Sequence, residues 1–372
     1  TVMLGMAVMG LADAIAALVG RMLPKPPLTL GREVKSWSGS LSFLIICSIL
    51  LFSIVNERLG LQGLAPWILI VLVLWLTIVE NSAGNGTDNL SVPLLFAWVF
   101  ATLIDVDEPE SAQQRFLWIA FPAAVFAFLG HWSKALTRDG SITAASLGII
   151  LYTYGGWAFV APMLLFFVSG SLFSRILQIP GQRTEKSGSR DPWQVLANGG
   201  IPAIALLFGV YTDHLDWAYT MYLSALACAT ADTWATEFGM RFGGKPRHIL
   251  TGRVLAPGLS GGVTIVGFCA SFLGALSIAS FALLFVTFGS WFWWVVGLGF
   301  LGSVVDSLLG IAQGKYIDNT SSSEDSITER PETNGQQNEI ATGYKWLNND
   351  LVNALSSAFA LVSAALFAGA AS

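Results

Sequence analysis

Long apolar stretches recur along the whole chain, and they constrain its fold more than any other feature. Segments such as 142–155 and 290–311 contain almost no charged residues, and many stretches approach the length of about 20 residues that a helix needs to cross a bilayer. Inside a bilayer the protein itself must satisfy each backbone N–H and C=O, so only helices and closed barrels span it. Segments of alternating polarity, typical of barrel strands, are absent. The sequence therefore predicts an all-α, polytopic membrane protein.

The composition agrees with this class. Charged residues make up 12% of the 372 residues, about half the share found in a soluble domain. The three cysteines, Cys47, Cys228 and Cys269, lie in apolar runs at no metal-site or disulfide spacing, so we interpret them as core residues. Membrane lipids are the expected partners, and no feature supports nucleic-acid binding.

About twelve transmembrane helices are predicted. If the chain crosses the bilayer with each, one face receives 17 of the 19 Lys and Arg residues. Basic loops mark the cytoplasmic side, so this face is predicted to be cytoplasmic (or stromal), with both termini on the opposite side. The polar segment 316–343 is predicted as a flexible cytoplasmic loop. The helices are expected at residues 1–20, 39–56, 65–80, 91–104, 116–131, 142–155, 157–175, 193–212, 218–239, 259–287, 290–311 and 349–371.

The sequence also contains an internal repeat. ADAIAALVG (12–20) and ADTWATEFG (231–239) share the spacing of Asp, Ala and Gly at the end of a predicted helix. A basic loop follows each and includes a Ser-Gly pair that we expect to open the next helix. A third helix carries a carboxylate, and a polar turn begins the fourth. These recurrences predict a parallel duplication of a four-helix unit; the corresponding pairs are Gly31-Arg32 and Gly252-Arg253, Ser38-Gly39 and Ser260-Gly261, Glu80 and Asp306, and 86–95 and 347–356.

Two carboxylates inside predicted helices are the leading candidates for a site. An ionisable residue there costs about 2.5–3.5 kcal/mol on insertion scales and by default indicates function. Asp232 shares a helical face with Thr236 and Gly239, whereas Glu237, about 140° away, is expected to face another helix or the membrane interface. Magnesium is usually held by one or two carboxylates together with substrate phosphates. We predict Asp232 and Asp306 as Mg²⁺ ligands.

A basic, glycine-rich loop follows Asp232 and suits phosphate, since Arg forks bind it bidentately and backbone N–H groups at a helix start attract anions. Simpler roles remain open: helix packing for the glycines, topology signals for single basic residues, and an N-cap for Asp350. The predicted phosphate-binding residues are Lys245, Arg247, Arg253, Ser260, Gly261 and Gly262.

From about residue 125 the chain resembles a family of membrane proteins that includes phytyl-phosphate kinase of the tocopherol pathway. The residues that carry the resemblance are VLANGGIPA (195–203), ATADTWATEFG (229–239), PRHILTGRVLAPGLSGGVTIVG (246–267), GSVVDSLLG (302–310) and WLNNDLVN (346–353). Residues 1–104 resemble part of the CTP-dependent phytol and dolichol kinases, through LADAIAALVGR (11–21), KSWSGS (35–40) and GTDNLSVPL (86–94).

The resemblance implies two consecutive phosphorylations of a long isoprenoid alcohol, which give first the monophosphate and then the diphosphate. It implies two modules, 1–104 and 125–372, joined by an acidic linker over 105–124. The second module would be the membrane kinase that converts a prenyl (phytyl) monophosphate to the diphosphate with Mg²⁺ and an NTP, CTP being favoured. In the second module Asn198 and Asp350 would support the catalytic carboxylates Asp232 and Asp306. A possible second site in the first module comprises Asp13, Arg32, Lys35, Glu80 and Asp88.

Two other functions remain open. A lipid-phosphate transporter or flippase also uses duplicated helical units with charges at membrane depth. A cytidylyltransferase that forms a CDP-lipid would suit the nucleotide-using kinases that the first module resembles.

The predicted topology can be tested by cysteine labelling. Arg183→Cys, Arg247→Cys and Asp325→Cys should react with an impermeant maleimide from the cytoplasmic side, and Glu108→Cys from the opposite side. Labelling of positions 247 and 108 from one face would contradict both the helix layout and the charge argument.

Overall fold

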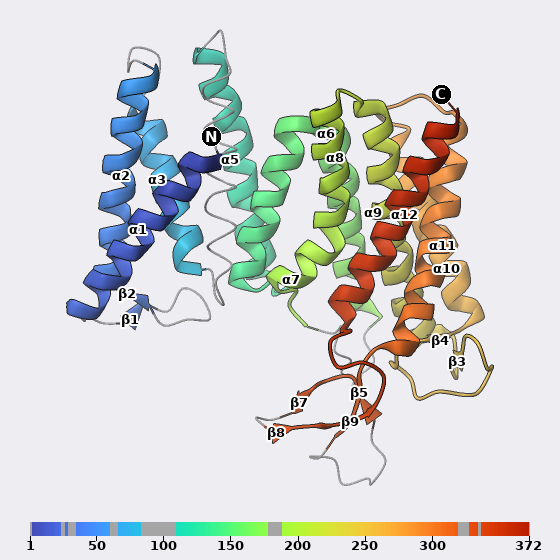
Figure 1. Cartoon of the computed structure of the whole chain (residues 1–372). Coiled ribbons are helices and arrows are strands. Elements are labelled where there is room, and N and C mark those ends of the chain that lie inside the picture. The colour runs from blue at the N-terminus through green and yellow to red at the C-terminus, as the bar shows by residue number, and fades with distance from the viewer. Residues whose placement is uncertain are drawn as a thin grey trace. The chain divides into compact units, whose positions relative to one another are not determined.

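The structure is a computed structural model that describes residues 2–23, 27–28, 35–59, 66–82, 109–177, 188–318, 327–333 and 336–371. It is mainly helical (Figure 1). The chain divides into two compact units. The first comprises Thr1–Thr153 with Arg190–Pro192, and the second comprises Tyr154–Ser189 with Trp193–Ser372.

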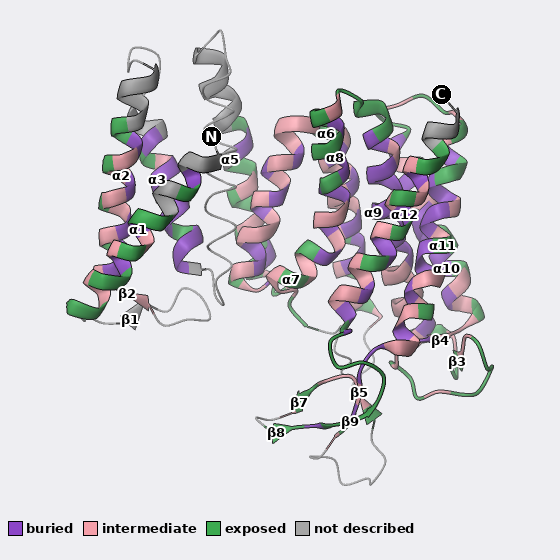
Figure 2. Ribbon diagram, viewed as in Figure 1, coloured by how far each residue is buried: buried purple, intermediate pink, exposed green. Residues whose placement is uncertain are grey.

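Several helices have the length and apolar composition of membrane spans. Many of their large apolar side chains are exposed, and Figure 2 marks exposed positions along these helices in green. In a bilayer these side chains face lipid rather than water. Predicted segment 91–104 lies outside the described residues. Among the described residues, five helices qualify as spans by length and composition: Arg138–Ile176, Pro192–Thr212, Ile265–Ala282, Ser290–Ala312 and Asn349–Phe367.

The first unit begins with three helices and a small hairpin. Helix α1 packs against α2, and α2 packs against α3. Strands β1 and β2 connect α1 to α2 as an antiparallel pair in which Pro27 lies opposite Ser36. The elements are α1 (Val2–Met22), β1 (Pro27–Leu28), β2 (Lys35–Ser36), α2 (Trp37–Leu59), α3 (Pro66–Ser82), α5 (Pro109–Trp132) and the start of α6 (Arg138–Ile176).

Helix α6 has a break at Gly156, whose backbone angles are φ 64° and ψ −158°. Glycine adopts a positive φ without the clash that a Cβ would cause. The break separates the two segments, 142–155 and 157–175, that the sequence predicts as independent helices.

In the second unit, helix α9 is the central element. It packs against α8, α10, α11 and α12, and its residues from Met221 to Ala231 are all buried. The elements are α7 (Pro192–Val195), the π-helix η1 (Leu196–Gly200), α8 (Ile201–Thr212), α9 (Leu215–Phe242), β3 (Arg247–His248), β4 (Gly262–Val263), α10 (Ile265–Ala282), α11 (Ser290–Ala312) and α12 (Asn349–Ala371).

Small residues bring α9 close to its neighbours. A Cβ on Gly302 of α11 would lie 2.5 Å from the Sγ of Cys228, and one on Gly299 would lie 2.6 Å from the Cβ of Ala227. On the other side, a Cβ on Gly274 of α10 would lie 3.0 Å from the Cα of Ala231. Such contacts are typical of membrane helices, because water drives no association there and close van der Waals packing must supply it.

The segment after α11 forms short strands. Strand β5 (Lys315–Ile317) pairs with β6 (Ile327–Thr328) and β9 (Glu339–Thr342), and β7 (Glu332–Thr333) pairs with β8 (Gln336–Gln337). The sequence predicted a flexible loop over 316–343, yet the described parts of this segment are strands and turns. The backbone pairing and the burial of Tyr316 explain this order, which its polar composition does not reveal.

The packing of α9 on α11 gives a stability prediction. Gly302→Ala should destabilise the protein by about 1–3 kcal/mol, since the added methyl overpacks against Cys228. Gly297→Ala, on the same helix, is the control, because its Cβ would meet no atom within 4 Å. Thermal unfolding in detergent measures both. The double change Gly302→Ala with Cys228→Gly should recover part of the loss, and equal melting temperatures for the two alanine variants would refute the packing argument.

Candidate functional site

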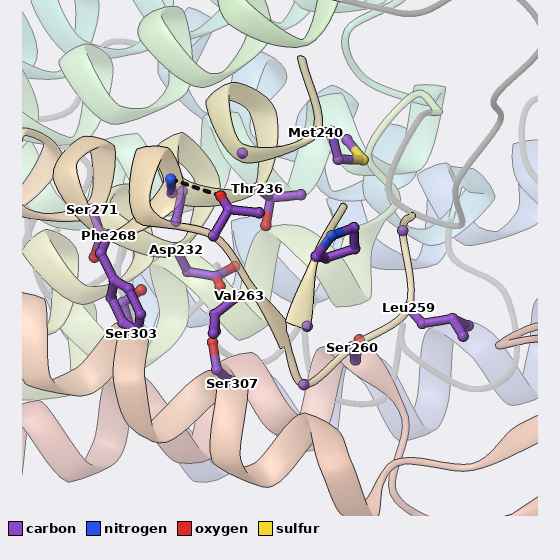
Figure 3. Close-up of a pocket in the computed structure, with 18 of the residues that line it drawn as sticks. Asp232, Thr236, Met240, Leu259, Ser260, Val263, Phe268, Ser271, Ser303 and Ser307 are labelled. Carbon is purple, nitrogen blue, oxygen red and sulfur yellow. Dashed lines mark hydrogen bonds between the residues drawn. The ribbon is translucent and has the colours of Figure 1, made fainter. Parts of the chain in front are cut away.

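A pocket in the second unit gathers the predicted carboxylates and the predicted glycine-rich loop. Asp232 and Asp306 both line it, as do Ser260, Gly261 and Gly262. Its empty volume is about 850 Å³, which includes space open to solvent. Figure 3 shows Asp232 and Thr236 of α9, Ser260 of the loop and Ser307 of α11 among the side chains that surround the pocket.

Helix packing explains why the two carboxylates meet. Cys228 and Gly302 are in contact between α9 and α11, and Asp232 and Asp306 each lie four residues further along the same helices. Residues four apart share a helix face, so the close approach at Gly302 directs both carboxylates into one space. Asp306 is buried and Asp232 is half-buried.

Helix α12 contributes a partner that the sequence analysis missed. The hydroxyl of Ser356 donates a hydrogen bond of 3.0 Å to Oδ2 of Asp306. Ser356 and Ser357 are fully buried in α12, and Asn349 and Asn353 precede them on the same helix face. This recurrence of polar residues at helical spacing in an otherwise apolar helix was the available signal.

The glycine-rich loop is held by the β3–β4 hairpin, in which Arg247 lies opposite Val263 and His248 opposite Gly262. Gly261 has a φ of 83°, and a Cβ there would lie 2.9 Å from Ile311 of α11. Only glycine combines this backbone with this contact.

The structure corrects one sequence expectation about this loop. Ser260-Gly261 does not open a helix, since β4 follows it and α10 begins at Ile265. Thr264 is the N-cap, and its Oγ1 accepts a hydrogen bond of 2.9 Å from the N–H of Gly267. A hydroxyl in this role satisfies an N–H that lacks a partner within the helix. Segment 259–264 is therefore not part of the helix predicted at 259–287.

The other predicted residues of this unit do not line the pocket. Lys245 before β3, Arg247 in β3 and Arg253 in the β3–β4 loop are all exposed. A guanidinium N–H of Arg247 donates to the carbonyl of Gly252 at 3.0 Å. Asn198 lies in the π-helix η1, which packs against α12. Asp350 is in the first turn of α12, and the cap there is Asn348, whose Oδ1 accepts from Leu351 N–H at 2.9 Å.

Glu237 matches its expectation. It does not line the pocket but faces α6, where it accepts a hydrogen bond of 2.5 Å from the hydroxyl of Ser174. On the same side of α9, the indole of Trp234 donates to the hydroxyl of Ser169.

The pocket supplies oxygen ligands of the kind that Mg²⁺ prefers. Besides the two carboxylates, the hydroxyl-bearing residues Thr236, Ser303 and Ser307 line the pocket. Within the described part of the chain, no three His, Cys, Asp or Glu residues form a cluster able to hold a metal by themselves. A site of two carboxylates fits Mg²⁺ bound jointly by the protein and a phosphate ligand.

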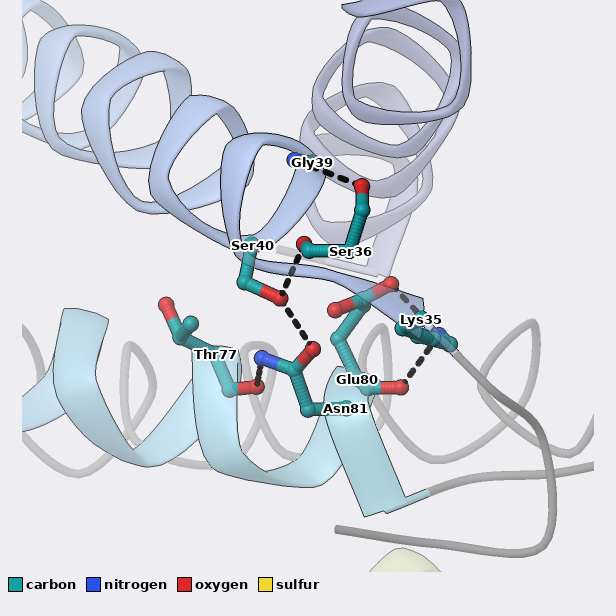
Figure 4. A network of polar contacts seen from close by, with 7 residues as sticks. All are labelled: Lys35, Ser36, Gly39, Ser40, Thr77, Glu80 and Asn81. Atoms are coloured by element: carbon teal, nitrogen blue, oxygen red, sulfur yellow. Dashed lines mark hydrogen bonds and ion pairs between the residues drawn. The ribbon is translucent and has the colours of Figure 1, made fainter. Parts of the chain in front are cut away.

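The first unit contains a second polar centre (Figure 4). Lys35 forms an ion pair of 2.5 Å with Oε1 of Glu80 and also donates to the backbone carbonyl of Glu80. Beside it, the Ser40 hydroxyl donates to Oδ1 of Asn81, whose Nδ2 donates to the Thr77 carbonyl. The structure thus brings together two of the five residues predicted here. Asp13 lies in α1, whereas Arg32 and Asp88 lie outside the described residues.

The two units share a local arrangement of helix, hairpin and helix. In the first, Gly20 of α1 approaches Gly39 of α2, and Ser36 Oγ accepts from the N–H of Gly39 at 3.1 Å. In the second, Gly239 of α9 approaches Gly267 of α10, and Thr264 Oγ1 accepts from the N–H of Gly267 as Ser36 Oγ does from Gly39. The glycines lie seven residues after Asp13 and Asp232, respectively.

Comparison with known proteins places the chain in a family. A family model described as integral membrane protein DUF92 matches residues 121–361. The chain belongs to this family. The match includes all the pocket residues and begins close to residue 125, where the sequence analysis placed the second module.

Individual relatives are moderately similar. An uncharacterized membrane protein of Methanocaldococcus jannaschii is 33% identical over 210 residues, which are 56% of this chain and 86% of that protein. Protein PGR of Arabidopsis thaliana is 28% identical over 229 residues, or 54% of this chain and 79% of that protein. An uncharacterized membrane protein of Synechocystis is 30% identical over 153 residues, or 39% and 59%. No solved structure matches the chain.

The Lys35–Glu80 pair gives a prediction for the first unit. The two side chains are 18% and 5% exposed, so Glu80→Gln leaves a poorly solvated ammonium and should destabilise the protein by about 3–5 kcal/mol. The double change Lys35→Met with Glu80→Leu should recover most of this loss. Chemical unfolding of the three variants in detergent measures the effect. A Glu80→Gln protein as stable as the wild type would show that the pair is not structural.

Proposed function

We propose that the protein is a membrane kinase that phosphorylates a prenyl (phytyl) monophosphate to the diphosphate with a nucleoside triphosphate as donor, CTP being favoured. The observation that carries the proposal is the joint position of Asp232, Asp306 and the Ser260–Gly262 loop around one pocket. This arrangement combines ligands for a divalent cation with backbone donors for a phosphate.

The position of the pocket suits a substrate that stays in the membrane. Asp306 lies six residues before the end of α11 and Asp232 ten before the end of α9, about 9 and 15 Å along the helix axes. A long prenyl chain is held in lipid by about 0.8 kcal/mol per CH₂. Its phosphate can then reach the pocket from the bilayer surface.

One wall of the pocket supports an apolar chain. Phe268 and Met240 line it, and the ring of Phe268 packs against Phe300, which in turn contacts Phe272. Phe272 is 44% exposed on the outer surface of α10. These rings form a continuous apolar cluster between the pocket and the exposed side of α10, against which a prenyl tail would pack.

In the proposed reaction an oxygen of the prenyl monophosphate attacks the γ-phosphorus of the donor. A new P–O bond forms, the bond between the γ-phosphorus and its bridging oxygen breaks, and the nucleoside diphosphate leaves. Such transfers require positioning and charge neutralisation rather than covalent help from the protein. A bound Mg²⁺ would neutralise phosphate charge, and Asp232 and Asp306 are the residues that would hold it. Ser260 would orient a phosphate through its N–H and hydroxyl, with Arg247 and Arg253 on the adjoining loop as further cations.

We further propose that the two units arose by duplication of one helical unit. The matching positions of Gly20 and Gly239, and of Ser36 and Thr264, support this. The first unit would then retain the scaffold of a phytol-kinase-like module. Its carboxylate Glu80, which corresponds to Asp306 in the predicted repeat, forms an ion pair with Lys35.

The substrate and the active unit can be tested together. Purified protein incubated with phytyl monophosphate, Mg²⁺ and each NTP should yield phytyl diphosphate by mass spectrometry, with phytol itself a poor substrate. Asp232→Asn and Asp306→Asn should each lower turnover by on the order of 100-fold, because stabilisation of charge by a metal is worth several kcal/mol. Asp13→Asn, the matched change in the first unit, should leave turnover nearly unchanged.

Other products would identify the alternatives. A CDP-adduct would identify a cytidylyltransferase, and unchanged substrate on the opposite side of a vesicle would identify a transporter. Equal losses from Asp13→Asn and Asp232→Asn would mean that both units contribute to one activity.

A further inference from the structure

A carboxylate from the segment after α11 occupies the glycine-rich loop. Oε1 of Glu329 accepts a hydrogen bond of 2.6 Å from the backbone N–H of Ser260, and Oε2 accepts one of 3.0 Å from the Ser260 hydroxyl. Glu329 lies 69 residues further along the chain, between β6 and β7. The contact is therefore not a local turn but the docking of a distant segment, residues 327–333, which we call the strap.

Two residues at the end of α11 complete the surroundings of this carboxylate. The Nε2 of Gln313 donates to Oε2 of Glu329 at 3.2 Å. Gln313 is only 1% exposed, and its own Oε1 has no hydrogen-bond partner among the described residues. Burial thus fixes the Gln313 side chain, with its amide N–H directed at the carboxylate.

Lys315 adds a positive charge. Its ammonium donates to the carbonyls of Gly310 and Ile311 in the last turn of α11. Burial lowers the pKa of Lys315, while the nearby Glu329 carboxylate raises it in part. The ammonium and the anion therefore share one poorly solvated environment, where their attraction is stronger than in water.

We infer that Ser260 and Gln313 form an oxyanion-binding site for a phosphate group, and that Glu329 occupies it in place of the ligand. The donors comprise one backbone N–H, one hydroxyl and one amide, and the Lys315 ammonium, held at the carbonyl of Gly310, adds a positive charge nearby, a combination suited to phosphate. A carboxylate imitates two of the phosphate oxygens. The strap is thus a built-in competitor for the site.

The site adjoins the pocket already described. Ser260 lines that pocket, and a Cβ on Gly310 would lie 2.9 Å from the Cβ of Ser260, so the loop packs directly on α11 one turn beyond Asp306. A phosphate at Ser260 would therefore lie beside the two carboxylates. The inference rests on the proposed function, since it specifies where one phosphate of the transfer binds and what must leave first.

Binding of inorganic pyrophosphate to the full-length protein in detergent tests the inference without any turnover. Calorimetry should show that Glu329→Gln binds pyrophosphate about 5- to 10-fold more tightly than the wild type, the factor expected if the site is open about 10–20% of the time. Glu332→Gln removes an exposed charge from the same strap and should not change the affinity. Ser260→Ala should weaken binding.

Hydrogen exchange provides a readout in the unmodified protein. Pyrophosphate should increase deuterium uptake in residues 327–333 and decrease it in residues 258–263. Equal affinity of the wild type and Glu329→Gln, or absence of pyrophosphate binding to either, would overturn the inference, as would binding that leaves exchange of the strap unchanged. If the strap is displaced but no NTP supports phosphoryl transfer, the anion site stands and the proposed kinase activity falls.

Discussion

The close approach of α9 to α10 and α11 is the interaction on which the rest of the second unit depends. Glycine and alanine at the contacts let the helix backbones approach closely, and inside a bilayer such van der Waals packing is a main source of helix association. The same contacts set the rotation of each helix about its axis, and so decide that Asp232 and Asp306 point into one space. The helix packing therefore also determines the geometry of the site, and a larger side chain at Gly302 would disturb both.

Much of this design can be predicted from the sequence. Apolar length predicts where the described helices lie, and helical periodicity separates the roles of Asp232 and Glu237, which the structure places on a pocket and against α6, respectively. Charge within an apolar helix was sufficient to select Asp306. These inferences succeed because each depends on one helix and its period, and tertiary contacts do not alter that period.

The failures concern contacts between segments far apart in the chain. The sequence of Ser260-Gly261 resembles the start of a helix. The hairpin that holds this pair, however, depends on the pairing of β4 with Arg247 and His248 of β3. Glu329 lies in a polar segment with no apparent order, and only the fold brings its carboxylate to Ser260. For Ser356, the polar residues at helical spacing in α12 indicated a polar face, but they did not show that Asp306 is the group this face meets. Local patterns do not encode such partners.

The Lys35–Glu80 pair has a consequence for the order in which the chain is made. Lys35 precedes Glu80 by 45 residues, so the ribosome releases the ammonium, with α1 and α2, before it releases the carboxylate at the end of α3. An unpaired carboxylate in such a poorly solvated place would cost free energy. When α3 emerges, the ammonium that neutralises Glu80 has already been made, so the carboxylate gains its partner as soon as α3 packs against α2. Docking of the third helix therefore depends on the earlier segment that carries Lys35, which ties the assembly of this unit to the order of synthesis.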